Sequence, residues 1–228
     1  MNQEETFKVA PSGLDYALKC KRCLWLSYRG IKLDTFFPPI FNAFDLIQKK
    51  FLVTQSIKLI SKILPEGRIM NELNGFVGSS ILKDKKGRPF VIRGKTDVVV
   101  EFKTKPKKYG IIDLKTTNIT PSKIENYKLQ LESYATIFEN PNSKTPKFSN
   151  IDELGLYLFE PKEITQILDQ NCNMKFETMY LKGNRCPNDL ISRVTSIIDI
   201  YLMKEAPDYN VTCNSCKFIL LLKKEKYI

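Results

Sequence analysis

Apolar and polar positions follow the clearest pattern between Gly94 and Thr117, which read GKTDVVVEFKTKPKKYGIIDLKTT. Valine and isoleucine dominate two runs in this stretch, and a segment rich in lysine and proline separates them. This pattern predicts two β-strands joined by a tight turn. If the turn centres near Lys105, residues at equal distances before and after it are paired, and Asp97 lies opposite Asp113. Opposed residues have Cβ atoms about 4.5 to 5.5 Å apart. Lys115 points to the same face as Asp113, so two acids and a lysine are expected to converge.

The spacing of apolar residues predicts further elements on both sides of this hairpin. Spacing near the helical period indicates helices at about residues 13–30, 42–64, 120–138 and 187–202. Shorter apolar runs indicate strands at about residues 76–82, 89–93, 154–159 and 174–181. Ser12 is expected to cap the first helix and Gly30 to end it. Residues 36–41 are predicted to form an extended link, and the segment between the last two strands, rich in Lys, Gln and Asn, a loop.

The order of these elements indicates an α/β fold in which a central mixed β-sheet has helices on both faces. We expect a single domain over residues 1–228. It comprises a helical N-terminal part (1–70), a sheet with one helix (75–181), and a last helix followed by a cysteine motif (187–228). One apolar face of the sheet is predicted to carry Val98, Val100, Phe102, Ile112 and Leu114.

Composition narrows the class of protein. Hydrophobic residues make up 43% and charged residues 27% of the chain, as in ordinary globular proteins. No apolar run reaches about 18 residues, and the opening MNQEETFKVA lacks a signal-peptide pattern, so we expect a cytoplasmic location and no membrane insertion. The formal charge of +11 favours an anionic partner, with nucleic acid first. The lysine runs at 83–86 and 103–108 either contact phosphates or are solvated turns.

The chain contains no histidine. This excludes mechanisms that need an imidazole base or ligand, among them Ser-His-Asp, Cys-His and HExxH chemistry. The pattern GxxxxGK[ST] is also missing from the sequence, so the chain lacks an ATP-driven motor of its own. Any unwinding of a nucleic acid would therefore come from a partner.

Asp97 and Asp113 together would form a site of hard oxygen ligands suited to Mg²⁺ or Mn²⁺. Such ions polarise a phosphodiester and lower the pKa of bound water. Lys115 would then orient or activate the water, or neutralise developing negative charge. The alternative is that Asp97 and Asp113 are separate acids at strand edges and that Lys115 pairs with one of them.

The cysteines form a second group. Cys20 and Cys23 lie near one end of the sequence, and Cys213 and Cys216 near the other, each pair in CxxC spacing. In a reducing compartment such pairs favour a four-thiolate metal site over disulfides, and the local spacing favours zinc. The site would join the first helix to the C-terminal end. The alternative is four reduced, buried cysteines. Cys172 and Cys186 have no close partner in the sequence and are interpreted as structural.

Three motifs in sequence order resemble the nuclease signature of the PD-(D/E)XK superfamily. They are Gly94-Lys95-Thr96-Asp97, Ile112-Asp113-Leu114-Lys115-Thr116, and Gln130 with Tyr134 in Q-x-x-x-Y spacing. The closest branch is the RecB-type nucleases, which include the iron-sulfur nucleases of CRISPR adaptation. The segments Cys20-Lys21-Arg22-Cys23-Leu24-Trp25-Leu26 and Cys213-Asn214-Ser215-Cys216-Lys217-Phe218 resemble the cysteine motifs of that branch.

The resemblance implies a restriction-endonuclease-like core and metal-dependent cleavage of DNA, on single strands or duplex ends. Asp97 and Asp113 would be the metal ligands, Lys115 the catalytic lysine, and Gln130 and Tyr134 groups that shape the site. The four motif cysteines would hold a [4Fe-4S] cluster, although that branch typically has one early and three late cysteines. Here the arrangement is two and two unless Cys186 joins them. The implied partners are DNA and a helicase or a CRISPR adaptation protein.

This chain departs from the family in one ligand. Many members carry an upstream histidine as a further metal ligand; here either Asp45 or Glu72 replaces it, or the site is poorer in metal. Gln130 and Tyr134 also have an alternative interpretation, in which Tyr134 packs in the core and Gln130 is exposed. The missing histidine leaves a second function open, a DNA-binding module that keeps the nuclease fold with weak or no turnover. A third possibility is a small-molecule or RNA-processing enzyme on the same scaffold.

Overall fold

The structure is a computed structural model that describes residues 6–31, 38–70 and 75–225. The described helices are α1 (Lys21–Tyr28), α2 (Ile40–Leu52), α3 (Lys128–Glu139), α4 (Pro187–Tyr201) and α5 (Asn214–Lys224), together with short 3-10 turns. The described strands are β1 (Phe7–Val9), β2 (Gly67–Ile69), β3 (Phe76–Gly78), β4 (Leu82–Lys83), β5 (Pro89–Lys95), β6 (Val98–Phe102), β7 (Tyr109–Thr116), β8 (Ile151–Leu168) and β9 (Asn171–Gly183). None of the described helices is long and apolar enough to cross a bilayer.

The larger sheet has the strand order β2-β6-β7-β8-β9. Its β7–β8 pair is parallel and its other pairs are antiparallel, so the sheet is mixed. In the β6–β7 hairpin Val98 pairs with Ile112 and Val100 with Gly110, which confirms the register expected for a turn centred near Lys105. The next residues along this register are Asp97 and Asp113.

A smaller sheet contains β1, β5 and β3 in that order, with β4 also paired to β5. The β1–β5 pair is parallel, and β3 and β4 are antiparallel to β5. The expectation of one central sheet is therefore corrected to two mixed sheets. The physical reason is that β5 finds its partners in short strands from elsewhere in the chain, and not in β6. The predicted mixed α/β class with flanking helices is confirmed.

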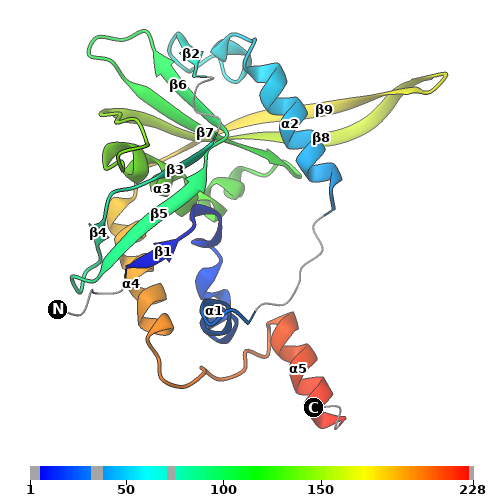
Figure 1. Cartoon of the computed structure of the whole chain (residues 1–228). Helices are drawn as coiled ribbons and strands as arrows, with labels where there is room; N and C mark the ends of the chain where they lie inside the picture. Colours follow the sequence, from blue (N-terminus) through cyan, green and yellow to red (C-terminus); the bar gives the residue numbers. More distant parts are fainter. Residues whose placement is uncertain (1–5, 32–37, 71–74, 226–228) are drawn as a thin grey trace.

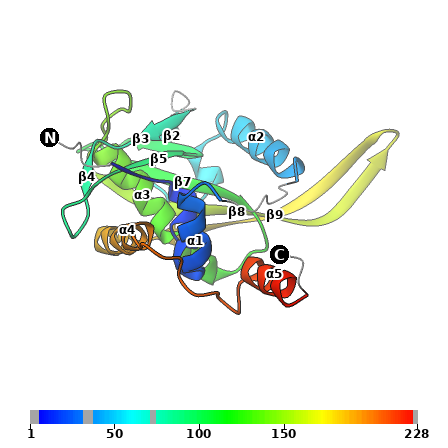
Figure 2. The same ribbon diagram turned by 60° about the horizontal axis from the view of Figure 1, so that its bottom comes forward.

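Helices cover both faces of the larger sheet. On one face, α3 and α4 pack over a core that includes Val99, Ile111 and Leu156. On the other face, the end of α2 and the 3-10 turn Ile57–Leu59 pack against the predicted apolar residues, which form a second cluster. This cluster comprises Val98, Val100, Phe102, Ile112 and Leu114 with Leu52, Ile57, Ile60, Leu64 and Tyr157. Figure 1 shows α2 on one side of β8 and β9, and Figure 2 shows α3 and α4 on the other side of the fold.

The segment between the last two predicted strands is not a loop. β8 and β9 continue through it as a two-stranded ribbon that projects from the body of the protein (Figure 1). Ile164 pairs with Met174 and Ile167 with Cys172 on one face of the ribbon. The polar residues that suggested a loop occupy the alternate positions, and Asp169, with φ of 50°, lies in the tight turn.

The helix boundaries also differ from expectation. α2 ends at Leu52, and the 3-10 turn Ile57–Leu59 follows after Ser56, whose side chain accepts a hydrogen bond from Lys58 N. The predicted first helix is replaced by 3-10 turns followed by α1, which Gly30 ends with φ of +80°, as predicted.

Two other expectations concern the termini of elements. The segment after Thr120 begins as the 3-10 turn Pro121–Asn126, and α3 starts only at Lys128. The predicted extended link at 36–41 lies partly outside the described residues, and its last two residues already belong to α2.

A buried ion pair joins α3 to the segment that precedes α4. The Glu132 side chain is fully buried and accepts hydrogen bonds from Arg185 Nη2 at 2.9 Å and from Cys186 N at 2.7 Å. Removing one partner of such a pair leaves an uncompensated buried charge. This contact therefore fixes α3, the helix that carries two of the predicted site residues.

We expect Arg185→Ala to lower the free energy of unfolding by about 3 to 5 kcal/mol, because it leaves the Glu132 carboxylate buried and unpaired. Urea unfolding at a fixed protein concentration measures this loss. Lys175→Ala is the matched control, because it removes only the exposed ion pair with Glu163, at 3.0 Å. Its expected cost is about 0.5 kcal/mol, and equal costs for both variants would contradict the prediction.

Candidate functional site

A cleft of about 690 Å³ opens where β5, β7 and the turn between β5 and β6 meet α2 and α3. Every residue predicted for the acidic site lines it: Asp45, Asp97, Asp113, Lys115, Gln130 and Tyr134. Glu72, the other candidate for the missing histidine, lies outside the described residues. The structure thus brings together residues that are far apart in the sequence.

Asp113 lies at the centre of the sheet and is 2% exposed. Gln130 Nε2 donates a hydrogen bond to Asp113 Oδ1 at 2.8 Å. Lys115 Nζ lies 2.5 Å from Asp113 Oδ2, an ion pair without the direction of a hydrogen bond, and Oδ2 accepts no hydrogen bond from the described residues. Burial raises the pKa of Asp113 to about 7, Lys115 opposes this rise, and Asp97 adds to it. The described partner of this buried carboxylate oxygen is therefore the Lys115 ammonium.

Asp97 occupies the turn between β5 and β6. Its Oδ2 accepts a hydrogen bond from Leu114 N at 2.8 Å, which fixes the carboxylate beside β7. Its Oδ1 lies 2.7 Å from Lys49 Nζ. Lys49 also contacts Asp45 at 2.8 Å, so one ammonium group bridges the two acids. The Asp45 carboxylate is therefore linked to Asp97 by the Lys49 ammonium, which contacts both acids.

Sequence reasoning missed Lys49. It lies one turn after Asp45 on α2, and this spacing was a signal for an ion pair but not for a contact with Asp97. Gln48 fixes the rotation of the helix, because its Nε2 donates to Thr116 Oγ1 at 2.9 Å. Burial alone would lower the pKa of Lys49, but Asp97 and Asp45 outweigh it and raise the pKa. Lys49 is therefore a cation at the site.

Lys115 is also held as a cation. Burial favours its neutral form, but the carboxylates of Asp113 and Asp97 outweigh this effect and raise its pKa. Its Nζ lies 5.0 Å from the centroid of the Tyr127 ring, a further favourable contact for a cation. The group is therefore suited to binding negative charge and not to accepting a proton.

Gln130 and Tyr134 have different roles. Asp15 accepts from Gln130 N at 3.1 Å, so it caps the start of α3 and positions the Gln130 amide over Asp113. Tyr134 is 4% exposed, and its hydroxyl donates to Lys95 O at 2.7 Å. A Cβ atom at Gly94 would lie 2.8 Å from Pro11 Cγ and 3.1 Å from the Tyr134 ring, so the close packing of Pro11 and Tyr134 on β5 favours glycine here. Tyr134 therefore packs in the core, which was one of the two alternatives that the sequence offered, and its hydroxyl also fixes the end of β5.

The four motif cysteines form one cluster, as predicted. Their Sγ atoms all lie within 4.8 Å of one another. Cys20 Sγ is 3.5 Å from Cys216 Sγ, and Cys23 Sγ is 3.6 Å from Cys213 Sγ. The cluster can hold a metal, and it joins α1 to α5. Cys186 lies apart from it, with its Sγ 3.7 Å from Lys128 O, and Cys172 is exposed on β9.

Helix ends explain the position of the cysteines. Cys20 is the N-cap of α1 and Cys213 the N-cap of α5, so both CxxC motifs start a helix, where the helix dipole stabilises thiolates. The backbone N–H of Cys216 lowers the pKa of Cys213 to about 7. Burial raises the pKa values of Cys20 and Cys23. Cys213 is therefore the cysteine that most readily forms a thiolate, and the other thiols of the cluster would lose their protons as a metal binds.

The distances between the sulfur atoms can be compared with those that a zinc ion or a [4Fe-4S] cluster would require. A tetrahedral zinc ion with Zn–S bonds of about 2.3 Å separates its sulfurs by about 3.8 Å, close to the observed contacts of 3.5 and 3.6 Å. A [4Fe-4S] cluster places one iron behind each thiolate and so needs the sulfurs farther apart. The donor set fits either group chemically, and the Cys20–Cys216 and Cys23–Cys213 contacts are near the sulfur spacing around a single ion.

Comparisons with known proteins add little beyond the fold. No protein-family model and no curated protein matches this chain. A solved structure titled "Crystal structure of SSO0001" is similar, with a TM-score of 0.50 and 13% sequence identity over 96% of this chain and 88% of that chain. At this identity the likeness concerns the fold alone. The nuclease resemblance therefore stays a prediction.

The C-terminal helix has few other attachments. Cys216 is the buried residue of α5, whereas Phe218 and Leu221 are largely exposed. The segment before the helix is held by Arg22 Nη1, which donates to Pro207 O at 2.8 Å, and by Asn210, which donates to Lys19 O at 2.7 Å. The cysteine cluster is therefore the main anchor of α5.

We expect Cys216→Ser to accelerate tryptic cleavage between Lys204 and Lys224 several-fold, because it weakens the cysteine cluster and increases local opening. Timed digestion followed by mass spectrometry measures the rate. Cys172→Ser is the control, because Cys172 is exposed and far from the cluster in the sequence. Identical rates for the two variants would contradict an anchoring role.

Proposed function

We propose that this protein is a metal-dependent DNA nuclease that hydrolyses phosphodiester bonds on single-stranded DNA or at DNA ends. The observation that carries the proposal is the convergence of Asp97, Asp113, Lys115 and Gln130 in one cleft, where Gln130 and Lys115 both contact the buried Asp113 carboxylate. The motif resemblance supports the same reaction. The low-identity likeness to a solved structure contributes no functional argument.

Asp113 and Asp97 would hold the divalent ion. Carboxylate oxygens are the ligands that Mg²⁺ and Mn²⁺ prefer, and a metal ion bound at Asp113 Oδ2 would share that oxygen with the Lys115 ammonium or displace it. The ion would polarise the phosphodiester and lower the pKa of an attacking water. Asp45 is a further candidate ligand, because it lies on the other side of Lys49.

The protein groups around the acids have separate tasks in this proposal. Lys115 is a half-buried cation and would offset the charge that develops on phosphate oxygens. Gln130 holds Asp113 in place through its amide, and its own position is set by Asp15. Tyr134 keeps the end of β5 against α3. These contacts preorganise the acids before a substrate binds.

Lys49 regulates access to Asp97. Its ammonium lies 2.7 Å from Asp97 Oδ1 and would compete with a metal ion for that oxygen. Asp45 offers Lys49 an alternative partner on the same helix, so the lysine can leave Asp97 without losing its ion pair. Binding of a divalent ion would therefore shift Lys49 towards Asp45.

The cysteine cluster is proposed to have a structural role. The sulfur distances favour zinc, whereas the motif resemblance favours a [4Fe-4S] cluster. Either group would need reduced thiols, which fits the proposed cytoplasmic location. Broad absorption near about 400 nm is expected only for an iron-sulfur cluster, because it arises from charge transfer between sulfur and iron. A helicase is a proposed partner because the sequence lacks a motor motif, and a CRISPR adaptation protein is the alternative that the motif resemblance suggests.

We expect Asp113→Asn and Lys115→Ala each to reduce divalent-dependent cleavage of labelled DNA by roughly a hundredfold or more, because each removes charge from the reacting site. Initial rates with Mg²⁺ or Mn²⁺ on single-stranded and duplex DNA measure this effect. Asp152→Asn and Lys108→Ala are matched controls, since that exposed ion pair lies outside the cleft lining. Circular dichroism checks that each variant is folded.

The same assay decides between the two candidate functions. Cleavage without added metal, or full activity in both site variants, would refute the nuclease proposal. Binding that weakens with salt, without cleavage under any divalent ion, would favour the alternative of a nuclease-fold DNA-binding module. The missing histidine is the observation that keeps this alternative open.

We expect Lys49→Gln to lower the Mn²⁺ concentration for half-maximal cleavage about fivefold, corresponding to ~1 kcal/mol for removal of a competing cation. A metal titration of the cleavage rate measures the shift. Lys50→Gln is the matched control, because Lys50 is the next residue on α2 and is exposed. An unchanged titration midpoint in Lys49→Gln would show that this lysine does not compete for the metal.

A further inference from the structure

The smaller sheet has one buried and one exposed face. Its buried side chains pack into the same core as α3 and α4, which lie beneath β3 and β5 in Figure 2. These buried residues are Phe7, Val9, Val77, Phe90 and Ile92. Because successive residues of a strand alternate between faces, the residues between them point away from the core. One end of this outer face borders the cleft described above, and the rest of the face lies outside the cleft lining.

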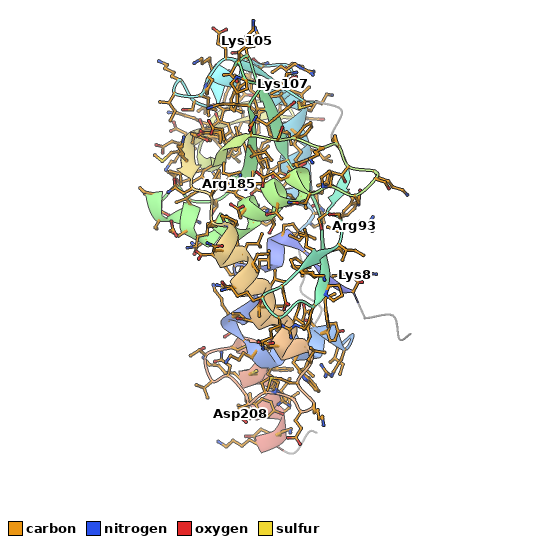
Figure 3. All side chains as sticks on the ribbon, turned by 90° about the vertical axis from the view of Figure 1, so that its left-hand side faces the viewer. Lys8, Arg93, Lys105, Lys107, Arg185 and Asp208 are labelled. Atoms are coloured by element: carbon orange, nitrogen blue, oxygen red, sulfur yellow. The ribbon has the colours of Figure 1, made fainter. Side chains whose placement is uncertain are left out.

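The outer face of the smaller sheet is basic. Cross-strand partners share a face, and the registers that define this one are Lys8↔Val91, Lys83↔Pro89, Gly78↔Arg93 and Phe76↔Lys95. Lys8, Lys83, Arg93 and Lys95 are all exposed on it. In the described strands of this sheet, no residue on the outer face is acidic. Figure 3 shows Lys8 and Arg93 on the same side of the molecule.

An exposed aromatic ring lies among these cations. Phe76 is 70% exposed, an unusual position for a large apolar side chain. The Arg93 guanidinium carbon lies 5.0 Å from the centroid of the Phe76 ring, so a cation and an aromatic face form one surface. Proteins that bind single strands combine such rings, on which bases stack, with cations that contact phosphates.

The basic face is continuous with the acidic cleft. Phe76, Arg93 and Lys95 line the cleft, and Lys95 ends β5 two residues before Asp97. Phe76 and Arg93 also line a second hollow of about 380 Å³, together with the exposed Lys144. A chain of phosphates lying along β5 would therefore pass from one hollow to the other and meet the acids at the end of the strand.

We propose that the outer face of the smaller sheet binds single-stranded DNA and leads it to the cleft. This inference rests on the proposed nuclease function, since the bound strand is the one delivered to Asp97 and Asp113. The cations of the face neutralise phosphates, and Phe76 stacks on an unpaired base. A duplex has its bases paired and stacked on one another, so only a single strand uses both features.

The charge part of the inference is tested with the double substitution Lys8→Gln and Lys83→Gln, both remote from the acids in the sequence. Binding of a fluorescent 30-nucleotide DNA strand is measured in EDTA, so that cleavage cannot interfere. We expect the slope of log K against log salt to fall in magnitude by about 1.4, since each phosphate contact on a single strand contributes about 0.7. Lys62→Gln with Lys204→Gln is the control, because both are exposed and the net charge changes equally.

The stacking part is tested with Phe76→Ala in the same assay. We expect about tenfold weaker binding of the single strand, because stacking of a base on an aromatic ring is worth on the order of this factor. Binding of a blunt duplex is expected to stay unchanged. Phe218→Ala is the matched control, since Phe218 is 55% exposed on α5 and lies away from the sheet.

The outcomes separate this inference from the proposed function. If both sets of variants behave as their controls while the unmodified protein cleaves DNA, the face does not bind the strand and the inference is overturned alone. If binding falls as expected but no divalent ion supports cleavage, the face is supported and the nuclease proposal fails. Equal losses on duplex DNA, or tighter binding of RNA than of DNA, overturn the assignment to single-stranded DNA.

Discussion

The burial of the Asp113 carboxylate is the constraint on which the rest of the site depends. A carboxylate in the middle of a sheet is costly unless neighbouring groups compensate for the lost water. Here the compensation comes from Lys115 on the same strand and from Gln130 on α3. Because Gln130 is positioned by Asp15, the first turns of the chain also contribute to that balance. Packing and site geometry are thus set by the same contacts.

Helices α1 and α5, which lie near opposite ends of the chain, are joined by the cysteine cluster and not by a polar network like the one around Asp113. Most helices bury an apolar face, whereas α5 is attached chiefly through Cys213 and Cys216. Metal–thiolate bonds can anchor a helix that contributes little to the hydrophobic core. This separates the stability of the α5 attachment from that of the sheet. Redox state or metal supply would then alter the C-terminal segment without disturbing the acids of the cleft.

Prediction from the sequence was most accurate for features that local backbone geometry determines, such as strand register and the face to which a side chain points. A tight turn fixes the register of β6 and β7, so Asp97, Asp113 and Lys115 followed from strand alternation alone. Motif spacing added Gln130 and the cysteine cluster. Lys49 could not be predicted, because its contact with Asp97 depends on how α2 crosses the sheet. The β8–β9 ribbon was missed because it projects beyond the core, where alternating polar residues no longer differ from those of a loop.

Under the proposed function, the charges of the cleft explain why a DNA strand would need a binding surface beside the acids. Asp45, Asp97 and Asp113 repel phosphate, and Lys49 and Lys115 are already paired with them. Under the proposed function, a divalent ion reverses this local repulsion, but only close to the ion. Phosphates farther along the strand would need cations that form no ion pair with an acid among the described residues. The outer face of the smaller sheet places such cations directly along the approach to the cleft, so metal binding and strand binding would act on adjacent parts of one substrate.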